Sequence, residues 1–299
     1  MRTRSAAARA EHADPQLARE PESKKERELV SSWEVIAEIR YAHVHGGYRK
    51  GMTIGEAFVS AFTLHNDTVN VWTHVTGLAI FAWLLVSTAS LPAPGGGVAA
   101  ERWPLHVYSL SALACLATSS TYHVFGTANE RWTRPLGKLD YCGIVALIVG
   151  SCVAPIHFGF ASVPAWRRFY LTLMSALGLA LVGCCQMSWF YLKEWRLLRI
   201  GLFVGLGAAC AAPLLHLLPH RRFDAPTVEL ATGVGWTLGT YLIGVVFYAT
   251  GVPESLAPGR FDYFAASHQW WHVCVVVAAL LQHDTLVRLW AAASLAQFD

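Results

Sequence analysis

The stretch LDYCGIVALIVGSCVAPIHF at residues 139–158 decides the fold class of this chain. After Asp140 it contains no Lys, Arg, Asp or Glu, and about 20 apolar residues are enough for a helix to cross the hydrocarbon core of a bilayer. Similar apolar stretches occur at 71–91, 105–126, 169–190, 198–218, 229–250 and 269–291. We therefore predict an all-α fold, a bundle of seven transmembrane helices.

The composition supports a membrane protein. Of the 299 residues, 54% are apolar and 14% are charged, whereas soluble domains carry about 25% charged residues. Residues 1–30 differ from the rest, because they are polar, charged and nearly free of aromatic side chains. That composition predicts a disordered tail, and the acids from Glu11 onward argue against a transit peptide. We thus expect a tail at 1–30 followed by one domain at 31–299.

Residues 33–66 precede the first predicted span and contain apolar side chains at helical spacing, such as Ile54, Phe58 and Phe62. This pattern predicts a short amphipathic helix along the inner membrane face. Orientation follows from Lys and Arg near the spans, because cytoplasmic segments carry the excess. With the N-terminus inside, the inner segments hold Arg40, Arg49, Lys50, Arg131, Arg134, Lys138, Lys193, Arg196, Arg199 and Arg260, against Arg102, Arg167, Arg168, Arg221, Arg222 and Arg288 outside. The excess predicts a cytoplasmic N-terminus.

Four polar groups interrupt the apolar stretches, where ionisable side chains are costly and therefore suggest function. They are HNDTVNVWTH at 65–74, SSTYH at 119–123, KLDYCG at 138–143 and SHQWWH at 267–272. In a chain of alternating spans, the end of an even span and the start of an odd span lie at the same face. His123 ends the second span, whereas Asn70 with His74, Asp140, and His268 with His272 begin odd spans. We therefore expect all four groups at the cytoplasmic face.

His268 and His272 are four residues apart, so on a helix their Cβ atoms lie about 6 Å apart and both rings can reach one ion. Such a pair alone could equally be an interfacial or packing pair. With His123 it forms a three-histidine set with an open fourth position, which is typical of catalytic zinc sites. Asp140 would support the site or accept a proton. Ser119 would reach the same centre, unless its hydroxyl bonds a carbonyl of its own helix.

The remaining histidines and the cysteines have simpler interpretations. His106, His157, His216 and His283 fall toward the opposite face and are scattered, so we expect packing or interfacial roles for them. His43, His45 and His65 precede the first span and are expected to be solvated. All seven cysteines lie in apolar stretches, where they behave as small buried hydrophobes. We therefore expect no disulfide framework.

Taken together, these groups resemble the progestin and adipoQ receptor family, which also contains haemolysin-III-type proteins. The match includes GYR at 47–49 and PGRFDYF at 258–264 and covers nearly the whole chain after residue 33. One departure is Asp67, where many relatives have glutamate, which keeps the charge. The resemblance implies a seven-helix fold with zinc near the inner face, held by His123, His268 and His272. It also implies that Asp140 positions a zinc-bound water and that Ser119 assists at a developing oxyanion.

Activities within that family differ, since some relatives are adiponectin or progestin receptors, some hydrolyse the amide of ceramide, and fungal relatives influence zinc and lipid homeostasis. Two hypotheses follow. The first is a zinc-dependent hydrolase of a ceramide-like lipid amide that also signals. The second is a receptor with structural zinc, whose agonist would be a steroid or lipid because the outer segments are short.

Other seven-helix functions fit the sequence less well. A retinal protein needs a lysine in a late span, and the last lysine, Lys193, lies in a connector. A pore is not favoured either, because the polar residues gather at one face instead of lining a path. We expect a multi-pass protein of the plasma membrane or an internal membrane, with no nucleic-acid partner. The sequence leaves open whether the chain is an enzyme, what its ligand is and whether it has a protein ligand.

Overall fold

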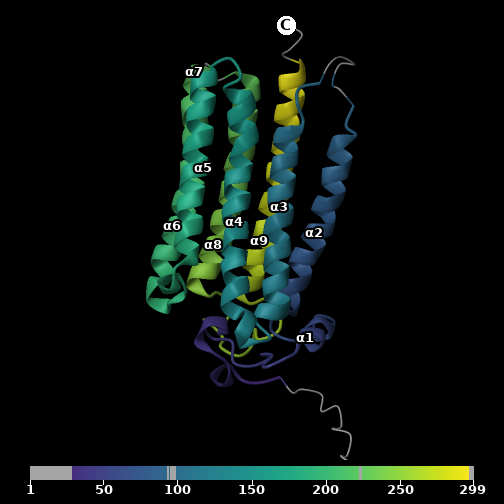
Figure 1. Ribbon diagram of the computed structural model, residues 1–299, viewed down its shortest axis with the longest axis vertical. Helices are drawn as coiled ribbons and strands as arrows, with labels where there is room; N and C mark the ends of the chain where they lie inside the picture. The colour runs from purple at the N-terminus through teal and green to yellow at the C-terminus, as the bar shows by residue number, and fades with distance from the viewer. Residues whose placement is uncertain (1–28, 93, 95–98, 222–223, 296–299) are drawn as a thin grey trace, which may run out of the picture.

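Long helices lie side by side in the computed structural model of this protein, which describes residues 29–92, 94, 99–221 and 224–295 (Figure 1). They are α2 (Thr68–Ala89), α3 (Trp103–Thr121), α4 (Glu130–Gly159), α5 (Pro164–Gln186), α6 (Arg196–Ala209), α7 (Ala212–His220), α8 (Ala225–Thr250) and α9 (Ser267–Leu295). The short α1 (Ile54–Ser60) and the first described residues cross one end of the bundle, and α9 ends at the other (Figure 1). The predicted all-α class is confirmed.

Among the described residues, six helical segments are long and apolar enough to cross a membrane: Thr68–Ala89, Glu130–Gly159, Pro164–Gln186, Lys193–His220, Ala225–Thr250 and Ser267–Leu295. The predicted span 105–126 corresponds to α3, which is not among them. Its hydroxyl-bearing side chains, such as the fully buried Ser109, lower its hydropathy. α3 packs against α2, α4 and α9, so those polar groups are sheltered by protein and need not face lipid.

The ends of two predicted spans differ from the structure in ways that matter for the site. The stretch predicted at 105–126 ends in a π-helical turn, Tyr122–Gly126. α4 begins at Glu130, well before the predicted residue 139, because the Asn129 side chain accepts a hydrogen bond from the backbone of Arg131 and caps the helix. Asp140 therefore lies almost three turns inside α4 instead of at its mouth.

The predicted span 198–218 is one stretch in the sequence but two helices in the structure. α6 ends at Ala209 and α7 begins at Ala212, with Pro213 in its first turn. Proline lacks a backbone N–H and is tolerated at the first turn of a helix, so it favours a new start at this point. The break places Cys210 opposite α4.

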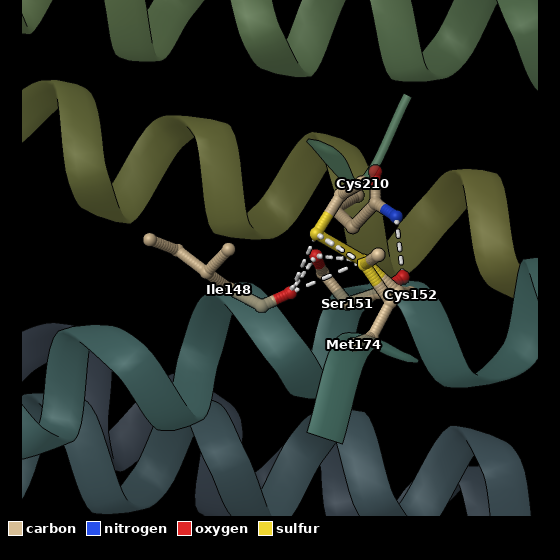
Figure 2. Close-up of a disulfide and its surroundings, with 6 residues drawn as sticks. Ile148, Ser151, Cys152, Met174 and Cys210 are labelled. Carbon is tan, nitrogen blue, oxygen red and sulfur yellow. Dashed lines mark hydrogen bonds between the residues drawn. A yellow bond between two sulfur atoms is a disulfide. The ribbon is translucent and has the colours of Figure 1, made fainter. Parts of the chain in front are cut away.

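Figure 2 shows the result of this break, a disulfide between Cys152 of α4 and Cys210. The two Cα atoms are 5.9 Å apart and the residues are separated by 58 positions in the sequence. The expectation that all cysteines are unpaired is thus wrong for these two, whereas Cys115, Cys142, Cys184, Cys185 and Cys274 are free. No short-range spacing connects the bonded pair, so the sequence pattern gives no sign of it.

The segment predicted at 33–66 as one amphipathic element is only partly helical. Before α1 it forms two short 3-10 turns and an irregular chain, which pack around Val35, Ile39, Val44 and Tyr48 and cover the end of the bundle. α1 is the α-helical part of this segment, with Ala57 buried and Ile54 and Phe58 more than half exposed. The tail predicted at 1–30 falls outside the described residues except for its last two.

Candidate metal centre

Three histidines, one from the π-turn after α3 and two from the first turns of α9, meet at the end of the bundle that carries α1. One ring nitrogen from each of His123, His268 and His272 lies within 4.8 Å of the other two. A zinc–nitrogen bond is about 2.0–2.1 Å long, so a small movement of the rings would let one ion contact all three. His123 and His272 are almost completely buried, and His268 is half-buried. The structure therefore brings together the three residues that the sequence analysis named as ligands.

The ring of His123 is oriented by a carboxylate. Its Nδ1 lies 2.8 Å from Oδ1 of Asp67, and the same oxygen accepts hydrogen bonds from the Tyr41 hydroxyl at 2.8 Å and the Asn70 amide at 2.9 Å. Burial raises the pKa of the Asp67 carboxyl, but the hydrogen bond from His123 and the charge of Arg49 lower it well below its ordinary range. Since Asp67 is ionised, Nδ1 of His123 carries the proton and Nε2 is left to bind a metal.

His272 is oriented in the same way by a backbone group. Its Nδ1 lies 3.1 Å from the carbonyl oxygen of Asn70, so this nitrogen donates and Nε2 has a free lone pair. His268 packs against Tyr41 with ring centroids 4.9 Å apart, and its buried Nδ1 has no partner among the described residues. These donor nitrogens have the chemistry that zinc prefers.

A fourth histidine lies beside the cluster. The ring of His74 stacks on that of His272 with centroids 3.8 Å apart, and both of its nitrogens are buried without a described partner. Asn70 and His74 thus join the other polar groups, as the parity of the spans predicted. Asn70 acts through Asp67 and through its own carbonyl, a role that the sequence analysis did not predict.

A widened helical turn carries His123. The Thr127 amide donates to the carbonyl of Tyr122, five residues earlier, which is the bonding of a π-helix. The carbonyl oxygens of His123 and Val124 instead accept from the guanidinium of Arg49, with a distance of 3.1 Å to Val124. Arg49 is 1% exposed and also donates to Ser60 and Thr127. It therefore acts as a buried clamp, a role that its place among the charges of the inner segments did not predict.

The first turn of α9, which carries His268, is fixed by a residue from the preceding loop. The carboxylate of Glu254 accepts from the Ser267 backbone N–H at 2.7 Å and from its hydroxyl. Glu254 is 2% exposed. An anionic acceptor at a helix N-terminus stabilises the orphan N–H groups there, so Glu254 sets the position at which α9 begins.

Asp140 and Ser119 lie on the open side of the cluster, where they line an internal cavity of about 840 Å³ together with His268 and His272. The Ser119 side chain interacts with the Asp140 carboxyl, while its neighbours Ser120 and Thr121 bond carbonyls of their own helix. From this end the cavity extends along the bundle to Phe160, Leu217 and Leu230, and most of its wall is apolar. The two carboxylates therefore differ in position: Asp67 lies behind a ligand and Asp140 faces the cavity.

The other histidines divide into two groups. His43 and His45 are exposed, as expected, but His65 is fully buried and its Nδ1 accepts from the Asp67 backbone N–H at 3.0 Å. Burial lowers the pKa of His65 to about 3, so its ring is neutral. Toward the opposite end, His216 bonds the Tyr170 hydroxyl and His283 contacts Thr88. The expectation that His65 is solvated was wrong because the chain folds back under the bundle.

Comparison with known protein sequences identifies relatives of this chain. The model of the haemolysin-III-related family matches residues 62–283, which include all three histidines and Asp140. The chain belongs to the haemolysin-III-related family. It is 32% identical to heptahelical transmembrane protein 3 of Arabidopsis thaliana, over 79% of this chain and 80% of that protein. It is 30% identical to the ADIPOR-like receptor IZH2 of Saccharomyces cerevisiae, over 86% and 83%, and to the adiponectin receptor protein of Drosophila melanogaster, over 82% and 56%.

Membership in this family agrees with the helices described above. The apolar helices and the heptahelical relatives together identify a multi-pass integral membrane protein. Trp83, Leu179 and Trp236 on the outside of the bundle are each about two-thirds exposed or more, at 67%, 72% and 69%, as expected for side chains that face lipid. Asp67 belongs to the polar group at 65–74 and Arg49 to the motif GYR, but the sequence analysis assigned a role to neither. Glu254 was missed altogether.

Proposed function

We propose that this protein is a zinc-dependent hydrolase of lipid amides of the ceramide type. One observation supports this most directly: the three-histidine cluster opens onto a large, mainly apolar cavity that also contains Asp140 and Ser119. A cavity of this size among membrane-spanning helices suits a hydrocarbon chain, and the polar end suits an amide. Pockets with a few convergent polar groups in an apolar wall are typical of small-molecule sites.

In this proposal His123, His268 and His272 hold the ion through their free ring nitrogens. When bound, zinc would polarise a carbonyl and lower the pKa of water into the neutral range. Asp67 and the Asn70 carbonyl keep the His123 and His272 rings in the tautomer that leaves Nε2 free. Arg49 and Glu254 fix the turns from which His123 and His268 project.

Asp140 would accept a proton at its carboxylate and return it to the leaving amine, since it faces the cavity and Asp67 does not. The Ser119 hydroxyl would hold the Asp140 carboxyl in place or donate to the carbonyl oxygen of the amide. The apolar wall formed by residues such as Phe203, Leu238 and Leu242 would bind the acyl chain and exclude water. Hydrocarbon binding then supplies affinity, and the polar end supplies the chemistry.

The proposal includes a topology. We propose that α3 is a seventh crossing, because it lies within the bundle between α2 and α4 and continues through the π-turn to Gly126. The N-terminus and the histidine cluster would then lie on the cytoplasmic side, as the distribution of Lys and Arg favours.

A second candidate is a receptor with structural zinc. Two relatives are named as receptors, the IZH2 protein and the Drosophila protein, and residues 29–66 cover the histidine end of the bundle. In that case a lipid or steroid in the cavity would shift helix packing without being cleaved.

The decisive experiment measures metal and turnover on the same purified samples in lipid vesicles. We expect wild type to contain about one equivalent of zinc and to release fatty acid from ceramide. His268→Ala would lose both zinc and turnover, whereas Asp140→Asn would keep zinc and lose at least about 100-fold in turnover. Asp284→Asn, an exposed acid on α9 away from the cluster, is the control and should match wild type. Full zinc occupancy without ceramide turnover in wild type would contradict the hydrolase and favour the receptor. Less than about half an equivalent of zinc in wild type would contradict the zinc site itself.

A further inference from the structure

A polar side chain interrupts the apolar wall of the cavity far from the histidines. Gln282 of α9 is 4% exposed and lines the cavity. Its amide Nε2 donates to the backbone carbonyl of Ser151 on α4 at 3.2 Å. The other amide atom, Oε1, is buried and has no partner among the described residues. Because the nitrogen bonds a carbonyl, the unpartnered atom is the oxygen, which is a hydrogen-bond acceptor.

This acceptor lies at a defined depth. α4 and α9 both run from the histidine end of the bundle toward the opposite end (Figure 1). Gln282 is ten residues after His272 and Ser151 is eleven after Asp140, and each residue adds about 1.5 Å along a helix. Both helices therefore place the amide about 15 Å from the histidine cluster along the cavity.

Ser151 and Thr237 line the same cavity as Gln282, and the hydrogens of their hydroxyls are already used. The Ser151 hydroxyl, beside the Cys152–Cys210 disulfide in Figure 2, donates to the Ile148 carbonyl at 2.7 Å. Thr237 of α8, which lines the same cavity and is 4% exposed, donates to the Gly233 carbonyl at 3.1 Å. In these three side chains the groups left free are acceptors, namely the amide oxygen of Gln282 and the lone pairs of the Ser151 and Thr237 hydroxyls. A molecule that satisfies them must supply an O–H or N–H.

A purely structural role explains only one of the two polar atoms of the Gln282 amide. Joining α4 to α9 needs Nε2 alone, and a buried amide oxygen without a partner is costly. We propose that Gln282, assisted by Ser151, is a polar subsite that binds a hydroxyl group carried about 15 Å along an elongated lipid. This inference rests on the proposed function in one respect, namely that a lipid chain occupies the cavity with its polar end at the histidines. It narrows the ligand class from plain acyl chains to chains or fused-ring lipids that carry a second, distal hydroxyl.

The test compares fatty acids that differ only in the position of a hydroxyl. Wild-type protein in vesicles is titrated with octadecanoate, with octadecanoate hydroxylated beside the carboxylate, and with octadecanoate hydroxylated about twelve carbons away, a length that spans about 15 Å. Displacement of a fluorescent fatty acid reports affinity. One additional buried hydrogen bond predicts about fivefold tighter binding of the mid-chain hydroxy acid than of the unsubstituted acid. The acid hydroxylated beside the carboxylate should show no such gain.

Two variants assign that preference to the subsite. Gln282→Met keeps the length and volume of the side chain, so it should bind octadecanoate within about twofold of wild type and lose the preference for the mid-chain hydroxyl. Ser151→Ala should reduce the preference and leave the contact to the Ser151 carbonyl intact. Gln186→Met is the matched control, because Gln186 is an exposed amide at the end of α5, and it should keep the full preference.

Equal affinity of wild type for the three acids would overturn the subsite and mean that the amide oxygen binds only water. That comparison needs no variant, so it decides the question even if Gln282→Met fails to fold. Absence of binding by any of the acids would overturn it as well. The proposed hydrolase is judged separately, since ceramide turnover without the hydroxyl preference would contradict only the subsite, and the preference without turnover would contradict only the hydrolase.

Discussion

Which nitrogen of His123 can bind a metal depends on one carboxylate oxygen. Asp67 Oδ1 accepts from His123 and is itself held by Tyr41 and Asn70, so the ring has a fixed tautomer and a fixed direction. Carboxylates of this kind raise the basicity of a histidine ligand and restrict its motion. At the scale of single residues, the metal affinity of the centre is therefore expected to depend on the groups that orient the histidines as much as on the histidines themselves.

Replacing that carboxylate should weaken metal binding without removing a ligand. We expect Asp67→Asn to lower zinc affinity by about 10- to 100-fold, because an amide can hold the ring but supplies no negative charge. Competition with a chromophoric chelator measures the affinity. The matched control is Asp262→Asn, a loop acid that bonds the backbone of His45 and Gly46 and does not touch a histidine ring. Equal zinc affinity in Asp67→Asn and wild type would contradict this role.

The meeting of the three histidines could be predicted from the sequence, because the alternation of spans is a strong constraint. Parity alone places His123, Asp140 and His268 at one face, and the structure brings the three histidines together there. The role of Asp67 could not be predicted, since it depends on how the residues before α2 turn under the bundle. The same is true of His65, whose burial follows from that path and from no local pattern.

At the scale of elements, the π-turn after α3 depends on a partner from outside the bundle. Its carbonyls at His123 and Val124 are directed to Arg49, which carries four described contacts. Arg49 also lies 3.9 Å from Asp67, so the buried guanidinium and the buried carboxylate compensate each other. A buried pair of this kind is costly to break, because the remaining charge loses its opposite charge.

We therefore expect Arg49→Met to destabilise the protein by about 3 kcal/mol or more and to reduce zinc retention. Thermal unfolding in detergent, followed by tryptophan fluorescence, measures the first effect, and metal analysis measures the second. Arg131→Met, an exposed arginine near the same end of the bundle, should change stability by less than about 0.5 kcal/mol. Similar losses of stability and zinc in Arg49→Met and Arg131→Met would contradict the role of the buried Arg49 contacts.

The start of α9 gives a second prediction for an element. Glu254→Ala removes the acceptor of both Ser267 donors, and loss of a helix cap costs about 1–2 kcal/mol. Because His268 lies in the same turn, we also expect faster zinc release, measured as the rate of transfer to a chelator. Glu254→Gln keeps one acceptor and should have an intermediate effect. If zinc leaves all three proteins at the same rate, the cap does not position His268.

For the whole molecule, the sequence predicted the rough extent of the apolar stretches better than their interruptions. Spans at 71–91, 229–250 and 269–291 differ from α2, α8 and α9 by a few residues at each end. The break between α6 and α7 was missed because Cys210 and Ala211 are as apolar as their neighbours, so hydropathy does not change there. The disulfide that joins Cys210, in that break, to Cys152 of α4 was missed too, because it results from tertiary packing.

Orientation in the membrane gives the prediction at this scale. Lys50 precedes α1 and Arg221 follows α7, and both are exposed. Figure 1 shows α1 and α7 at opposite ends of the bundle. With a cytoplasmic N-terminus, we expect Arg221→Cys to react with a membrane-impermeant maleimide in intact cells and Lys50→Cys to react only after permeabilisation. The background is the unsubstituted protein, whose free cysteines are buried or half-buried. The reverse labelling pattern would place the histidine cluster on the outer side.

The clamp formed by Arg49 has a consequence for where the working unit of this family begins. The shared family match starts at residue 62, yet Tyr41 and Arg49, which hold Asp67 and the turn of His123, come earlier in the chain. A polypeptide started at residue 62 would contain all three clustered histidines and every long apolar helix and still lack two of the groups that hold that cluster in place. The segment needed to hold the histidine cluster in place is therefore longer than the segment that the family model matches. It begins before Tyr41.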